Sequence, residues 1–115
     1  QAHTGHTAER NGVDGEKLAV IWEYETSSLF TEAERAALRI AQGSGSVPNG
    51  ATDEMFAAAR EHYTDDQLAA IVAVASFFGY LNRWNDTIAT TLEESPTNFG
   101  NSVLADRGWT PGNHA

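Results

Sequence analysis

Residues 51–87, ATDEMFAAAREHYTDDQLAAIVAVASFFGYLNRWNDT, decide the fold class of this 115-residue chain. Two helix starts lie in this stretch. Thr52 precedes two acidic residues, so a capping hydroxyl and two negative charges fall at the positive end of a helix dipole. Thr64 and Gln67 form a capping box, in which each side chain satisfies an otherwise unpaired backbone donor. The stretch therefore predicts two consecutive helices.

The two helices differ in how their apolar residues are spaced. The first should bury a stripe at helical spacing, formed by Met55, Phe56, Ala59 and Tyr63. In the second, apolar residues occur on every side from Leu68 to Trp84, and a helix of that kind must be buried all round. A 115-residue monomer has difficulty surrounding it, so we expect part of it to lie in a subunit interface of an obligate oligomer.

Three more helices are predicted before residue 51. Thr31 and Glu34 form another capping box, and the helix that begins there should end in the glycine- and serine-rich loop at 43–50, which we expect to be flexible. Asp14 should cap a short amphipathic helix over 15–25. The first predicted helix occupies residues before Gly12, which supplies a C-terminal stop.

The ends of the chain carry weaker signals. Gln1 is not a start methionine and falls inside the first predicted helix, so we expect a truncated or processed chain. Residues 93–115 are polar and rich in glycine and proline, with one weak helix expected around 98–105. The sequence therefore predicts an all-α helical domain over residues 1–92, with about five helices, and a polar C-terminal arm over 93–115.

Composition excludes several classes of function. Sixteen acidic and seven basic residues give a net charge of -9, which argues against nucleic acid and anionic membranes as partners. The longest apolar stretch, 68–81, is shorter than the roughly 20 residues that span a bilayer. The chain contains no cysteine, so it cannot form a disulfide or a cysteine-based metal site. We expect no cofactor, no metal and, by default, a cytoplasmic location.

Three segments together resemble a known family. They are QAHTGHTAERNGV at 1–13, FTEAERAALRIAQ at 30–42, and the stretch from residue 51 that includes LNRWND at 81–86. Their order is similar to that of the carboxymuconolactone decarboxylase and alkyl hydroperoxidase D family, over about residues 1–92. The resemblance implies an all-α bundle that assembles into trimers or hexamers.

The resemblance also implies a place for the catalytic residues. The peroxidase branch carries the motif C-x-x-C-x-x-x-H, and if His3 is its histidine, both cysteines precede Gln1, the second by two positions. His3 would then be a proton relay, because a thiolate nucleophile needs a neighbouring base or cation. The alternative is a polar surface histidine. His6 matches no motif position and is the weaker candidate, and the His3–His6 pair lacks a third nearby ligand for a metal.

Asn82, Arg83 and Asp86 form a second polar cluster, at the end of the long apolar helix. Arg83 has the geometry to hold a substrate carboxylate and can also pair with Asp86 one turn along the helix. We favour a structural role, a buried ion pair or cap that fixes the helix register, since polar groups at such positions usually satisfy neighbouring backbone or subunits.

The leading functional hypothesis is that the complete protein is a thiol-dependent peroxidase that reduces a small-molecule peroxide. One alternative, on the same implied fold, is a decarboxylase-like lyase acting on a lactone acid with histidine or glutamate chemistry. Another is a non-enzymatic helical oligomerisation or interaction domain. The 115 residues alone hold no thiol nucleophile, so by themselves they should not reduce peroxides by a dithiol route.

Overall fold

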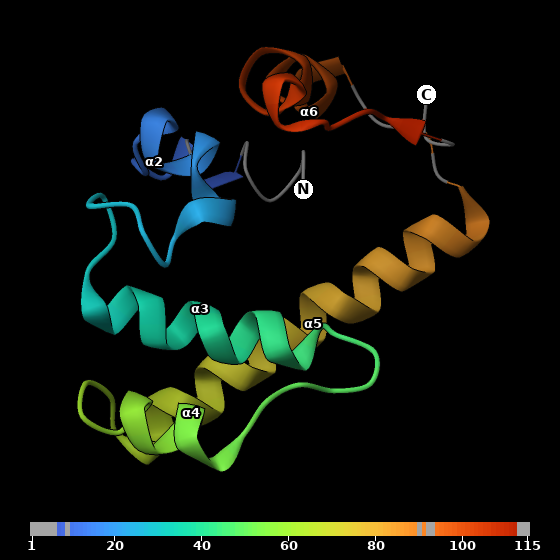
Figure 1. Ribbon diagram of the computed structural model, residues 1–115. Coiled ribbons are helices and arrows are strands. Elements are labelled where there is room, and N and C mark those ends of the chain that lie inside the picture. Colours follow the sequence, from blue (N-terminus) through green and yellow to red (C-terminus); the bar gives the residue numbers. More distant parts are fainter. Residues whose placement is uncertain (1–6, 9, 90, 92–93, 113–115) are drawn as a thin grey trace. The chain divides into compact units, whose positions relative to one another are not determined.

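A computed structural model describes residues 7–8, 10–89, 91 and 94–112 of the chain. All regular structure within these residues is helical (Figure 1). The α-helices are α2 (Gly15–Ala19), α3 (Glu32–Ser44), α4 (Asp53–Ala59), α5 (Asp65–Ile88) and α6 (Glu94–Phe99). Shorter turns are η1 (Ile21–Glu23), η2 (Gly100–Leu104) and η3 (Ala105–Arg107). The predicted all-α class with about five helices is therefore confirmed for the part of the chain that the structure describes.

The chain divides into two compact units. One unit is Tyr24–Trp84, and the described residues before and after it form the other. Each unit has its own buried residues and is treated separately below. The domain boundary expected at residues 92 and 93 stays a prediction.

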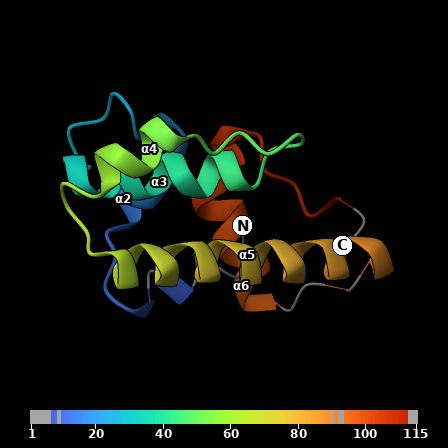
Figure 2. The same cartoon turned by 90° about the horizontal axis from the view of Figure 1, so that it is seen from below.

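The core of the Tyr24–Trp84 unit lies where α3, α4 and the beginning of α5 pack side by side (Figures 1 and 2). Its buried residues come from all three helices, namely Ala36, Ile40, Ala59 and Leu68. Partly buried side chains pack around them, namely Met55, Phe56, Tyr63, Ile71 and Val72. The Tyr63 hydroxyl donates a 2.8 Å hydrogen bond to the carbonyl of Ala33 in α3. The residues predicted to form the α4 stripe thus pack on the core, although Tyr63 lies beyond the end of α4 and Ala59 is the buried one of the four.

The helix starts follow the predicted capping pattern. Both reciprocal hydrogen bonds of the Thr31–Glu34 box are present, and so are both bonds between Thr64 and Gln67. Thr52 accepts from the Met55 amide at the start of α4. These bonds satisfy amides that have no partner inside the helix, so three residues fix where the helices of this unit begin.

The loop after α3 is held more firmly than its composition predicts. The Gly50 amide donates a 2.8 Å hydrogen bond to the Gly43 carbonyl, so the chain folds back onto the end of the helix. A Cβ atom at Gly43 would lie 2.9 Å from the Ala51 amide nitrogen, closer than real side chains come. Glycine is therefore required at position 43 because the backbone of Ala51 approaches it closely. A flexible glycine-serine loop would not require glycine at this position.

The helix predicted over residues 15–25 is shorter in the structure. Gly12 adopts the expected left-handed conformation, with φ of 94°, and Asp14 caps α2 through the Glu16 amide. However, α2 is followed by the 3₁₀ turn η1 instead of continuing through the predicted range of 15–25, and Trp22 is 57% exposed. The β-branched residues at this point, Val20 and Ile21, favour such a break because their side chains crowd the preceding helical turn.

After Ile88, the chain contains more structure than predicted. Helical turns run from Glu94 to Arg107, where the sequence indicated only a weak helix over 98–105. Phe99 and Leu104 are buried, and a Cβ atom on Gly100 would meet the ring of Trp109 at 2.5 Å. The ring of Trp109 therefore lies directly against Gly100, a contact that the polar composition of this segment does not indicate.

The expectation that α5 is buried all round is wrong for the single chain. Leu68 is 4% exposed, but the large apolar residues further along the helix are exposed, namely Val74, Phe77, Phe78, Tyr80 and Trp84. The physical reason is that α3 and α4 cover only the first turns of α5, which runs on past them (Figure 2). No helix among the described residues has the length and apolarity needed to cross a membrane.

Candidate functional site

The histidines implied by the family resemblance, His3 and His6, lie outside the described residues. Their roles stay predictions. In the described ranges no group of three or more histidine, aspartate and glutamate side chains is arranged to hold a metal ion.

The second predicted cluster lies on the C-terminal part of α5. Asn82, Arg83 and Asp86 are all exposed on this helix. The burial that we expected for an Arg83–Asp86 pair is therefore not found in the single chain. The exposed turn that carries the cluster also carries Trp84, which is 57% exposed. Whether the cluster binds substrate or has a structural role stays a prediction.

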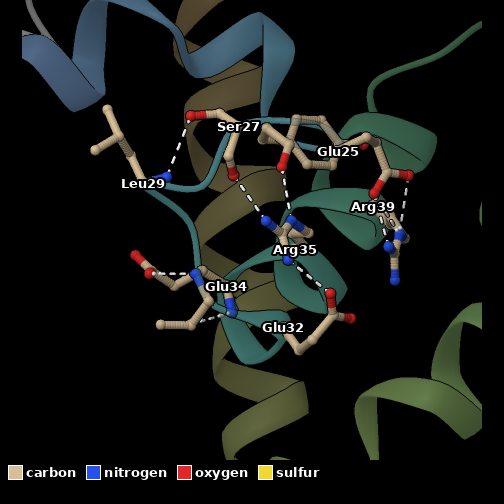
Figure 3. Close-up of polar contacts among 9 residues, drawn as sticks. Glu25, Ser27, Leu29, Glu32, Glu34, Arg35 and Arg39 are labelled. Carbon is tan, nitrogen blue, oxygen red and sulfur yellow. Dashed lines mark hydrogen bonds and ion pairs between the residues drawn. The ribbon is translucent and has the colours of Figure 1, made fainter.

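A further polar cluster, on α3, was not among the residues predicted from the sequence. Arg35, on α3, points toward the segment before the helix and donates three hydrogen bonds (Figure 3). Its Nε reaches the Tyr24 carbonyl at 2.9 Å, and its Nη2 reaches the Ser27 carbonyl at 2.7 Å. Its Nη1 pairs with Glu32 at 2.6 Å. One half-buried guanidinium thus fixes two backbone carbonyls of the preceding loop.

A second arginine strengthens the same attachment. Arg39 makes a bidentate pair with Glu25, with nitrogen–oxygen distances of 2.6 and 2.9 Å (Figure 3). The Arg39 hydrogen bond lowers the pKa of Glu25, and Glu25 in turn raises the pKa of Arg39. The buried Tyr24 hydroxyl donates to Gln42 Oε1 at 2.6 Å, and desolvation by burial raises the pKa of Tyr24.

This arginine clamp, formed by Arg35 and Arg39, has a structural role. Each arginine is paired with loop acceptors or acidic side chains, so both charges are used to hold residues 24–30 on α3. The sequence did contain a signal for it. The two arginines lie four apart on one helix face, and a carboxylate and open carbonyls precede the helix.

A groove between α4 and α5 could also hold a ligand. It is open to solvent, has a volume of about 460 Å³, and is mostly apolar. Its lining residues are Phe56, Arg60, Asp65, Leu68, Ala69, Val72 and Ala73. Arg60 and Asp65 form an exposed pair at 3.3 Å, and none of the lining side chains is a ready nucleophile. The groove offers an apolar surface with one exposed ion pair.

The comparisons with known proteins found similarity only to solved structures. No family model matches the chain, and no curated protein matches it. Two solved structures do, both of the debrominase Bmp8. One has no ligand, and the other is a variant with a cysteine replaced by alanine, in complex with 2,3,4-tribromopyrrole. Each has a TM-score of 0.81 and 30% sequence identity, covering 89% of this chain and 55% of the debrominase.

The chain thus spans about half the length of the debrominase that it matches. That enzyme has a helical fold of the carboxymuconolactone decarboxylase and alkyl hydroperoxidase D type. The architecture of this chain is therefore similar to part of an enzyme of that fold.

Proposed function

We propose that the complete protein containing these residues is a thiol-dependent oxidoreductase of the carboxymuconolactone decarboxylase and alkyl hydroperoxidase D family. The observation that carries the proposal is the similarity of 89% of the chain, at a TM-score of 0.81, to a debrominase. The resemblance of QAHT at residues 1–4 to the sequence that follows a C-x-x-C pair supports it independently. The 115 residues would supply the helical half after the cysteines.

The comparison favours thiol chemistry over the lyase alternative. The ligand complex of the debrominase was obtained with a variant that has alanine in place of a cysteine. Removing a reactive thiol is a direct way to keep a substrate or product intact in a site, because the thiolate is the nucleophilic form of cysteine. The ligand of the debrominase is a brominated pyrrole and not a peroxide. Brominated aromatic compounds should therefore be tested as substrates beside hydroperoxides.

Both candidate reactions are two-electron reductions by a dithiol. With a hydroperoxide, one thiolate attacks the distal oxygen, the oxygen–oxygen bond breaks, and the alcohol and water are released as the two cysteines form a disulfide. With a bromopyrrole, the ring carbon gains hydrogen, bromide leaves, and the cysteines again form a disulfide. An external thiol then restores the dithiol. Alcohol and bromide are therefore separate products by which the two substrates are told apart.

His3 has a defined role in this proposal. In the motif it follows the second cysteine by four positions, which is one helical turn. It would accept the proton of the attacking thiol or donate one to the leaving group. Asn82, Arg83 and Asp86 belong to the proposal only as a polar cluster that binds substrate or stabilises the assembly. Their exposure on α5 is compatible with either role.

The experiment uses the complete protein with dithiothreitol as the reductant. Turnover of an alkyl hydroperoxide and of tribromopyrrole is followed by alcohol formation and bromide release. We expect activity on at least one substrate, and loss of that activity when either upstream cysteine is replaced by serine. Absence of cysteines before Gln1, or full activity without them, would reject the proposal.

Replacing His3 and His6 separately tests the role of His3, with His6 as the matched control. His3→Gln should reduce turnover by about 10²-fold, as for loss of a general acid–base group, and should shift the pH profile of thiol alkylation upward. His6→Gln, which alters a histidine outside the motif, should change both by less than about twofold. Equal effects of the two substitutions would contradict the assignment of His3. Turnover of a lactone acid without thiols would favour the lyase.

A further inference from the structure

The short helix α2 packs against residues from the other end of the chain. It has five residues, Gly15–Ala19, and none of them is fully buried. Isolated helices shorter than about 12–15 residues are marginal in water, so α2 depends on its packing partner. In the structure α2 contacts η2, which belongs to the same compact unit.

The segment that contains η2 is closed by one aromatic ring. Phe99 and Leu104 are 6% and 7% exposed, and Gly100 is buried as well. After η3, Gly108 takes a left-handed conformation with φ of 83°, and the Trp109 amide donates to the Leu104 carbonyl at 3.3 Å. The chain thereby turns back and places the Trp109 ring against Gly100, where a Cβ atom would lie 2.5 Å from the ring.

Hydrogen bonds also join α2 to the residues that precede it. The Val13 amide donates to the Ala8 carbonyl at 3.0 Å, and Gly12 has the left-handed φ of 94° that closes a helix end. Asp14 then caps α2 by accepting from the Glu16 amide at 2.9 Å. The turn between this helix end and α2 is short and bonded on both sides. The direction of α2 therefore sets the direction of the helix end before it.

We propose that residues 94–112, termed the C-terminal segment, position the redox motif of the complete protein, with Trp109 as a positioning residue. The inference rests on the proposed function, since the residues predicted to follow the cysteines directly precede Thr7. The contacts run from Trp109 to η2, from η2 to α2, and from α2 through the turn at 11–14 to the helix end. A thiolate and its proton partner need close alignment, and a misplacement of about 1 Å can cost on the order of 10²-fold in rate.

The first test measures α2 without reference to activity, in the 115-residue chain. Gly100→Ala adds a Cβ that must displace the Trp109 ring. We expect the amides of residues 16–20 to exchange with deuterium about 10-fold faster in this variant, while those of α3 keep their rates. Gly79→Ala is the matched control, because its Cβ meets nothing within 4 Å, and it should not speed the exchange of residues 16–20. Unchanged exchange of residues 16–20 in Gly100→Ala would overturn the proposal.

The second test uses the complete protein and the alkylation of its thiols as a function of pH. Trp109→Ala should lower kcat about 10-fold and shift the alkylation profile upward, as His3→Gln does, because the motif loses its alignment. Trp109→Phe keeps a ring at this position and should restore most of both. Leu68→Ala controls for a general loss of stability, since it weakens the other unit and should leave the profile in place. An unchanged profile in folded Trp109→Ala would overturn the proposal, and so would an equal shift in Leu68→Ala.

The positioning role and the proposed function fail in different ways. Activity of the complete protein that does not need its cysteines would reject the proposed function, and with it the redox role of the C-terminal segment, whatever the exchange of α2 shows. Cysteine-dependent turnover that is the same in the unsubstituted protein and in Trp109→Ala would leave the function standing and reject the positioning role.

Discussion

The two halves of α5 have similar composition and different surroundings. In the first half, Leu68 is 4% exposed and lies in the core with α3 and α4, and Ile71 and Val72 pack beside it. In the second half, Phe77 and Trp84 are each 57% exposed. Apolar residues show that a helix must be covered, but they do not say by what. The neighbouring helices of the same chain cover one half and leave the other exposed.

The largest expected effect compares truncation in the two halves. Leu68→Ala should lower the free energy of unfolding by about 3 kcal/mol, because it removes a buried side chain and leaves a cavity. Phe77→Ala should change that free energy by less than about 0.5 kcal/mol when measured with the dissociated chain, because the ring is exposed. Urea unfolding at low protein concentration compares them. Equal losses would mean that the second half is covered within the chain.

A pair of glycine substitutions sharpens the comparison. Gly43→Ala should destabilise the chain by about 2 kcal/mol, since the new Cβ would meet the Ala51 backbone at 2.9 Å and α3 or its loop must shift. Gly79→Ala should instead stabilise it by about 0.5–1 kcal/mol, because the Cβ enters open space and alanine is the better helix former. Thermal unfolding measures both effects, and the midpoint temperature should fall for Gly43→Ala and rise for Gly79→Ala. A stabilising Gly43→Ala would refute the close approach.

The caps that start α3 and α5 should each contribute a similar, smaller amount. Thr31→Ala and Thr64→Ala each remove a hydroxyl that accepts from a backbone amide, and each should cost about 1 kcal/mol. Thr31→Ser keeps the acceptor and serves as the control, with a cost of at most a few tenths of a kcal/mol. Denaturation in urea measures all three. If Thr31→Ser cost as much as Thr31→Ala, the methyl group and not the cap would be the stabilising part.

The arginine clamp should give the smallest effect and a defined pH dependence. Arg39 lowers the pKa of Glu25 in the folded chain below its ordinary value of 4.5. The stabilisation is therefore present above about pH 4.5 and is lost as the pH falls through the lower folded value. The pair is partly exposed, so Arg39→Gln should cost only about 0.5 kcal/mol at neutral pH. The cost should shrink as the pH falls below 4.5 and vanish once Glu25 is protonated in the folded chain, and a cost that persists after that protonation would contradict this origin.

The sequence predicted the local parts of this fold well. Thr31, Thr52 and Thr64 begin helices because capping depends on residues three or four apart, which the sequence shows directly. Contacts between residues that lie apart in the sequence were less predictable. The contact of Gly100 with Trp109, the approach of Gly43 to Ala51 and the clamp of Arg35 on Tyr24 all join backbone or rings that no periodicity places together.

The candidate site was predicted only in outline. His3 and His6 came from the family resemblance and lie outside the described residues. Asn82, Arg83 and Asp86 were expected at a buried helix end and are found exposed, because the neighbours that would cover α5 there were inferred from apolarity and not from contacts. Burial is a property of the assembled neighbours, so it is the part of a site that one sequence predicts least reliably.

The central claim, that α3 and α4 cover only the first half of α5, is tested most directly by hydrogen–deuterium exchange at a protein concentration where the chain is monomeric. Amides of residues 65–72, which lie beside the core, should be protected more strongly than amides of residues 74–84, which lie on the exposed half of the helix. Equal protection of the two segments would contradict this account.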